Sequence, residues 1–124
     1  MAGNFWTQDE IVKKARSGEI RQAEYAQKWS ILKQGKHCTL AAADVGAPGG
    51  YPLHVHRYHD EVIIILEGEG EVVVGDESRV LKKGDVFFVP KGTPHTTRFV
   101  NQCMGIYSPA FDTDNPDRII VEKS

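Results

Sequence analysis

Two histidines and a glutamate lie close together at the start of a strongly apolar stretch, PLHVHRYHDEVIIILEG. One residue separates His54 from His56, so in a β-strand their side chains project from the same face. Two imidazoles on one face can bind a divalent ion, and the carboxylate of Glu61 would add a negative charge and an oxygen donor. An isolated H-x-H pair is weak evidence for a metal site, because a short motif needs its structural context.

A second stretch, GDVFFVPKGTPH, supplies that context by placing a third imidazole just after a turn. Its apolar centre, residues 86–89, is flanked by two turns that contain Gly or Pro. His95 then opens another strand, residues 96–100, which is rich in β-branched and aromatic side chains. A histidine at this position can face into a barrel from its rim. The two stretches together predict a metal site of three imidazoles and one carboxylate: His54, His56, Glu61 and His95.

The spacing within both stretches resembles the two motifs of the cupin family. The first family motif, G-x5-H-x-H-x3–4-E-x6-G, is similar to residues 54–68, and the second, G-x5-P-x-G-x2-H-x3-N, is similar to residues 84–95. The sequence departs from the pattern at Pro48, where the first motif opens on Gly, and at Phe99, where the second closes on Asn. Both positions are structural in the family. The resemblance therefore still implies the four metal ligands, of which Glu61 is also the catalytic candidate.

The strand pattern independently predicts an all-β fold. Many short apolar or β-branched segments are separated by Gly- and Pro-containing turns, which is typical of a sandwich or barrel. The resemblance implies the cupin double-stranded β-helix, a jelly-roll barrel. We expect strands at residues 27–32, 38–45, 62–66, 71–74, 78–81, 86–89, 96–100, 104–108 and 118–122. Residues 20–25 are ambiguous, and loops are expected at 46–52 and 109–116.

A capping box predicts one short helix before the barrel. The Thr7 hydroxyl would cap the first turn while the Glu10 carboxylate reaches back, and Gly18 would end a helix from about residue 8 to residue 17. Four apolar side chains are expected to pack it on the barrel: Phe5, Trp6, Ile11 and Val12. The chain is thus divided into an N-terminal helix and lead-in, residues 1–26, and a cupin β-barrel domain, residues 27–124.

The composition fits one globular domain. A chain of 124 residues is long enough to bury a single core. Its net charge of −2 gives no reason to expect nucleic acid or an anionic membrane as a partner, and no apolar run is long enough to span a bilayer. The two cysteines, Cys38 and Cys103, are too few for a disulfide framework and are expected as buried, inert thiols. We therefore predict a cytoplasmic protein.

Side chains near the four ligands are candidates for contact with substrate or for support of the ligands. Arg57 and Tyr58 would lie at the mouth, where a guanidinium can bind a carboxylate or phosphate. His59 is expected in the connecting turn, supporting the ligands rather than binding metal. Three further residues are expected to line the cavity, the first two because they share strand parity with His95: Thr97, Phe99 and Tyr107.

A divalent ion with these ligands keeps one or two positions for water, substrate or dioxygen, as catalytic sites do. The predicted cofactor is one divalent transition metal, Fe, Mn, Ni or Zn, because mixed nitrogen and oxygen ligands do not choose among them. The expected function is a mononuclear metalloenzyme acting on a small oxygenated compound. Dioxygenase chemistry leads, and isomerase, lyase or decarboxylase chemistry stays open. The alternative is a non-catalytic small-ligand-binding or sensor cupin.

Two partners are expected. One is a small molecule, because a small apolar cavity suits it better than a polymer. The other is a second copy of the chain, since a small barrel with an open sheet edge risks uncontrolled pairing unless a homodimer buries it. Residues 27–32, or the helix before them, are the segment expected to reach across.

Overall fold

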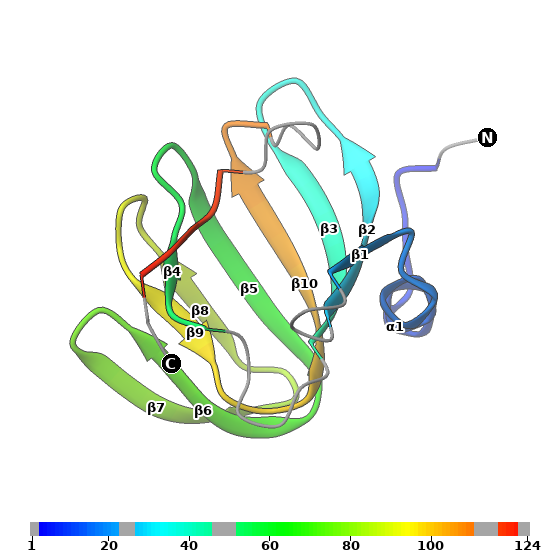
Figure 1. The fold of residues 1–124 in the computed structure, drawn as a ribbon. Helices are drawn as coiled ribbons and strands as arrows, with labels where there is room; N and C mark the ends of the chain where they lie inside the picture. Colours follow the sequence, from blue (N-terminus) through cyan, green and yellow to red (C-terminus); the bar gives the residue numbers. More distant parts are fainter. Residues whose placement is uncertain (1–2, 23–26, 46–51, 111–116, 122–124) are drawn as a thin grey trace.

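Two antiparallel β-sheets face each other in the computed structural model, with one helix on the outside of the larger sheet (Figure 1). The structure describes residues 3–22, 27–45, 52–110 and 117–121. The larger sheet has the order β1 (Ile20–Gln22), β2 (Gln27–Gln34), β3 (Thr39–Val45), β10 (Asn101–Ser108), β5 (Asp60–Glu67) and β8 (Val86–Val89). The smaller sheet has the order β11 (Ile119–Ile120), β4 (His54–Val55), β9 (His95–Thr97), β6 (Glu69–Val74) and β7 (Glu77–Lys82). The predicted all-β double-stranded β-helix is confirmed.

The inner faces of the two sheets form the main core. Ile65 of β5, Val72 of β6 and Cys103 of β10 are buried there together with Phe99. Burying such side chains between two sheets is the main stabilising term of a sandwich, at roughly 25 cal/mol for each Å² of apolar surface removed from water. The core fills the middle of the sandwich, and the cavity described below lies beside it, sharing Cys103 with the core.

The helix α1 (Gln8–Ser17) has the predicted bounds and the predicted capping box. Glu10 N donates to the Thr7 hydroxyl, and Thr7 N donates to the Glu10 carboxylate. Buried Ile11, Val12 and Ala15 pack against Ala42 and Leu66 on the outer face of the larger sheet, with Trp6 at the edge of this cluster. The proposed division at residue 26 stays a prediction.

Two expectations about apolar residues are wrong. Phe5 is 90% exposed, because it precedes the helix cap and lies outside the contact between α1 and the sheet. The strand expected at residues 96–100 ends at Thr97. Here the chain leaves the smaller sheet for the larger one, so Phe99 enters the core outside any strand, although its type favours a strand.

The remaining expectations concern loops, cysteines and membranes. The expected loops at 46–52 and 109–116 lie mostly outside the described residues, as does Pro48. Cys103 is buried as expected, and burial raises the pKa of its thiol to about 12, whereas Cys38 is exposed, so the expectation of two buried thiols is wrong. Within the described residues, no helix has the length and apolar character needed to cross a membrane.

Candidate metal centre

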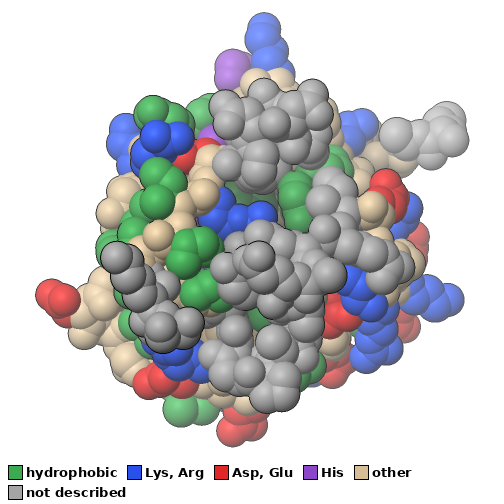
Figure 2. Space-filling model, viewed as in Figure 1, with side chains coloured by type: hydrophobic (Ala, Val, Ile, Leu, Met, Phe, Trp, Pro, Cys, Tyr) green, Lys and Arg blue, Asp and Glu red, His purple; other side chains and the backbone are tan. Residues whose placement is uncertain are grey.

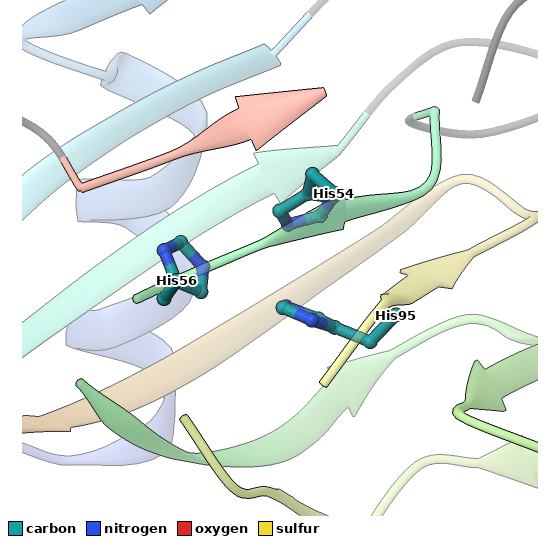
Figure 3. A group of neighbouring side chains, drawn as sticks. All are labelled: His54, His56 and His95. Atoms are coloured by element: carbon teal, nitrogen blue, oxygen red, sulfur yellow. The ribbon is translucent and has the colours of Figure 1, made fainter. Parts of the chain in front are cut away.

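Strand pairing brings the two sequence motifs together. His54 of β4 is the direct partner of His95 of β9, so their side chains lie on the same side of the smaller sheet. The Gly92 amide, in the turn before β9, donates to the carbonyl of His56 and ties the turn to the first motif. Residues 54–56 and residue 95, far apart in the chain, therefore present their imidazoles to one space (Figure 3).

The three imidazoles form a compact group. One ring nitrogen from each of His54, His56 and His95 can be chosen so that all three lie within 4.8 Å of one another. The ring centres of His54 and His95 are 4.2 Å apart, and those of His56 and His95 are 5.1 Å apart. His56 and His95 are buried and His54 is partly buried. Burial and the nearby His95 lower the pKa of His54 to about 3, so this imidazole is neutral at physiological pH and its lone pair can bind metal.

A backbone carbonyl fixes the orientation of each ring. The Nδ1 atoms of His54 and His95 lie 2.8 Å from Pro52 O and 2.9 Å from Thr93 O, and that of His56 contacts Asp117 O. A carbonyl oxygen can only accept, so each Nδ1 carries the proton. Each Nε2 is therefore left with a lone pair, which is the tautomer that a metal-binding histidine requires.

Glu61 reaches the same space from the opposite sheet. It stands at the start of β5, and its carboxylate oxygens lie 3.1 Å from His95 Nε2 and 3.6 Å from His56 Nε2. Burial by itself raises the pKa of Glu61, but the contact with His95 and the neighbouring imidazoles lower it to about 2. The carboxylate is therefore charged at neutral pH, beside the triad of imidazoles.

These groups fit a divalent cation. Among the described residues, neither Glu61 Oε1 nor His95 Nε2 has a hydrogen-bond partner, although both atoms are buried. With the proton on Nδ1, the His95 Nε2 lone pair faces a carboxylate oxygen 3.1 Å away, and two acceptors cannot satisfy each other. A cation bound by both Glu61 Oε1 and His95 Nε2 would satisfy these two atoms. The four-ligand set nevertheless stays a prediction until metal binding is measured.

Asp117, which sequence reasoning missed, lies beside the site and contacts several of its neighbours. Its backbone oxygen holds His56, while its buried carboxylate accepts from the Tyr58 amide and contacts Arg57 and His59. Burial would raise the pKa of Asp117, but these hydrogen bonds lower it to about 2. His59 Nδ1 lies 3.0 Å from the Asp117 carboxylate, and its expected role in supporting the ligands stays a prediction.

A cavity of about 70 Å³ opens in front of the imidazoles. Thr97 and Tyr107 line it, as expected from the sequence. Tyr107 is the cross-strand partner of Glu61 and is hydrogen-bonded to it, and burial and the Glu61 charge raise the pKa of the phenol well above its usual value. Two polar side chains that sequence reasoning missed also line the cavity, Gln27 and Arg118.

Three candidates do not line this cavity. Arg57 has a side chain that is 52% exposed and pairs with Asp117. Tyr58 is 61% exposed and lies beneath the Arg57 guanidinium, 5.0 Å from ring centre to Cζ. Phe99 packs in the core between the sheets. The strand parity that placed Phe99 beside His95 fails, because the strand ends two residues earlier.

The fold and the site define a class: a small double-stranded β-helix in which three imidazoles and a carboxylate meet between the sheets. The family model described as "Cupin domain" matches residues 44–102, which carry all four predicted ligands. A solved RmlC-like cupin from Shewanella frigidimarina superposes with a TM-score of 0.66 at 28% identity, over 81% of this chain and 91% of that chain. The chain belongs to the cupin family, and the sequence-based recognition is confirmed.

Some relatives are named as enzymes, and others are uncharacterised. An uncharacterised protein of Aquifex aeolicus is 35% identical over 90% of this chain and 88% of its own length. The quercetin 2,3-dioxygenase of Bacillus subtilis is 40% identical over 43% of this chain, but only 16% of the dioxygenase is covered. The dimethylsulfoniopropionate lyase DddQ of Ruegeria pomeroyi is 44% identical over 48% of this chain and 31% of the lyase.

Proposed function

We propose that the protein is a mononuclear metalloenzyme that acts on a small oxygenated compound. His54, His56, His95 and Glu61 would hold one divalent transition metal. The observation that carries the proposal is the arrangement of the three imidazoles: each Nδ1 is held by a backbone carbonyl, which leaves each Nε2 lone pair available beside a buried carboxylate. Such preorganisation is what a metal site needs and what a structural cluster of histidines does not require.

The names of two relatives support an enzyme of this kind. One is called a dioxygenase and the other a lyase. The match covers only 16% of the dioxygenase and 31% of the lyase. Dioxygenase chemistry on a diketone or catechol is therefore the first reaction to test. Isomerase, lyase and decarboxylase chemistry follow, because the ligand types do not select the metal or the reaction.

The cavity residues have separate roles in this proposal. A bound divalent ion would act as a Lewis acid toward substrate oxygen atoms and, if it is redox-active, would give access to dioxygen chemistry. Glu61 would offset part of the ionic charge at the site. The Tyr107 hydroxyl, whose raised pKa keeps it protonated, donates its one proton to Glu61 and can accept a hydrogen bond from a substrate hydroxyl. Apolar side chains in the cavity wall, such as Ile63 and Phe87, would limit the access of water.

Metal reconstitution followed by activity screening tests this function. Metal-free protein is loaded separately with Fe(II), Mn(II), Ni(II) or Zn(II), and oxygen uptake is measured with small diketones and catechols. Consumption of oxygen and substrate by one metal form, lost in His95→Ala, supports the proposal. Tight binding of such compounds without turnover in any metal form would contradict it and favour the non-catalytic sensor.

A further inference from the structure

One basic side chain inside the cavity has no role in the function described so far. Arg118 lines the cavity in front of the imidazoles, and it also lines a smaller adjoining cavity of about 30 Å³. The two cavities share five residues: Gln27, Ala43, His56, Tyr107 and Arg118. Figure 2 shows basic side-chain atoms inside a hollow near the middle of this face, bordered by hydrophobic side chains. Arg118 lines the same cavity as the predicted metal ligands.

We propose that Arg118 and Gln27 form a carboxylate-binding subsite. The natural ligand is then a small carboxylic acid whose other oxygen atoms bind the metal that the imidazoles would hold. This inference rests on the proposed function, because it names the substrate class of the same site. A guanidinium presents a planar fork of donors that matches a carboxylate, and an amide side chain can add one more donor.

The fold holds the residues on both sides of Arg118 in place. The preceding residue, Asp117, is fixed by contacts with Arg57, Tyr58 and His59. The following residue, Ile119, pairs with Val55 in the strand that also carries His54. Arg118 Nη1 also lies 3.5 Å from Gln27 Oε1, so the side chain is directed to the cavity wall formed by β2. A preorganised arginine loses less conformational freedom when it binds an anion.

The balance of charge in the cavity also favours an anionic ligand. Among the described lining residues, Arg118 is the only Lys or Arg, and Glu61 is the only Asp or Glu. Their charges cancel, so binding of a divalent ion would leave the cavity with a net positive charge. The remaining wall is largely apolar, including Val45, Ile63 and Phe87, and a wall of low polarity strengthens the attraction of the cavity for an anion.

Two hydroxamates that differ in one end of the molecule test the subsite. Succinic monohydroxamate carries a metal-chelating head and a carboxylate tail, whereas butyrohydroxamate carries the same head and an uncharged tail. Both are titrated calorimetrically into Zn(II)-loaded protein. The wild type should bind the carboxylate probe at least about tenfold more tightly than the neutral probe, since hydrogen bonds between ionised groups are the stronger ones.

Variants separate the subsite from the metal centre. Arg118→Gln should bring the two affinities to within about twofold of each other without loss of zinc, and Arg118→Lys should keep part of the preference. Arg16→Gln, which removes the same charge from the exposed face of α1, should change neither affinity. The zinc content and thermal unfolding of each sample show that the variants are folded and loaded.

The outcomes distinguish this inference from the proposed function. If zinc binds but the wild type does not prefer the carboxylate probe, or the preference persists in Arg118→Gln, the subsite is refuted while the metal site stands. If the wild type binds neither zinc nor either hydroxamate, the metal site is refuted and the subsite falls with it.

Discussion

Each histidine of the candidate metal site contacts a backbone carbonyl through its Nδ1 atom. Pro52 O, Thr93 O and Asp117 O hold the three Nδ1 atoms, and two of these carbonyls come from the residue two positions before the histidine. A local carbonyl of this kind moves with the histidine it orients. The imidazoles of His54 and His95 are therefore set by their own short segments, and only His56 depends on a distant part of the chain.

Glu61 supplies the negative charge of the site. Replacing it by Gln should leave some metal bound, because three imidazoles remain, but should raise the charge of the site by one unit. We expect turnover per bound metal to fall by about tenfold or more, and metal occupancy to fall by less. The measurement is kcat together with metal content. The matched control is Glu67→Gln, which removes the same charge from the far end of β5, where Glu67 pairs with Lys83. Unchanged turnover per metal in Glu61→Gln would show that Glu61 is not a functional ligand.

The low pKa of His54 predicts how the metal-free protein responds to acid. Burial and His95 depress the pKa from 6.5 to about 3, so this group stabilises the fold fully above pH 6.5. As the pH falls below 6.5 the unfolded chain binds a proton that the folded chain does not, and this contribution decreases until the pH passes about 3. Between pH 7 and pH 4.5 the metal-free wild type should lose roughly 2 kcal/mol more stability than His54→Gln, measured by urea unfolding. Equal losses in both proteins would mean that His54 titrates normally.

At the scale of elements, the three imidazoles depend on three short strands in one sheet, whereas Glu61 comes from β5 in the other sheet. β11 pairs with β4, and β4 pairs with β9 through His54 and His95. The sequence predicted the four ligands because their spacing lies within two short motifs, and it predicted α1 because Thr7 and Glu10 are local signals. It could not predict Asp117, Arg118 or Gln27, because they reach the site only through pairing of distant segments: Asp117 lies 61 positions after His56 in the chain. The early end of β9 was missed for the same reason, since the crossing between sheets overrides the strand propensity of Phe99.

The contacts of Asp117 predict that the segment before β11 supports the metal site. Asp117→Ala removes the carboxylate that accepts from Tyr58 N and contacts His59 and Arg57, so the carbonyl that holds His56 loses its anchor. We expect the affinity for Zn(II) to fall by about 10- to 100-fold, as is common when a partner that orients a metal ligand is removed. Asp76→Ala, in the exposed turn between β6 and β7, is the control and should bind normally. Equal zinc affinities in the two variants would argue against this support.

At the scale of the whole molecule, the larger sheet still has edges to cover. β1 pairs with β2 only over Gln27–Trp29, so residues 31–33 lie at the sheet edge beyond the end of β1. At the opposite edge, Val86 and Phe88 of β8 are exposed. Exposed edges and apolar side chains of this kind are usually covered in a stable protein.

We therefore expect a homodimer. Light scattering coupled to size-exclusion chromatography at micromolar concentration should give twice the 13.8 kDa mass of one chain. His95→Ala should have the same mass as the wild type, since His95 belongs to the smaller sheet and to neither of these edges. A 13.8 kDa particle across the concentration range would refute the dimer and leave the site unaffected.

The central claim is that His54, His56, His95 and Glu61 bind one metal ion, and metal content tests it most directly. Wild type, His95→Ala and the control His37→Ala are incubated with Zn(II), dialysed and analysed by mass spectrometry for zinc per chain. His37 is exposed and lies outside the triad. His37→Ala therefore removes one imidazole, as His95→Ala does, but leaves the candidate site intact. We predict about one zinc per chain in wild type and His37→Ala, and less than about one tenth of that in His95→Ala, with unchanged circular dichroism. Full zinc occupancy in His95→Ala, or none in the wild type, would contradict the claim.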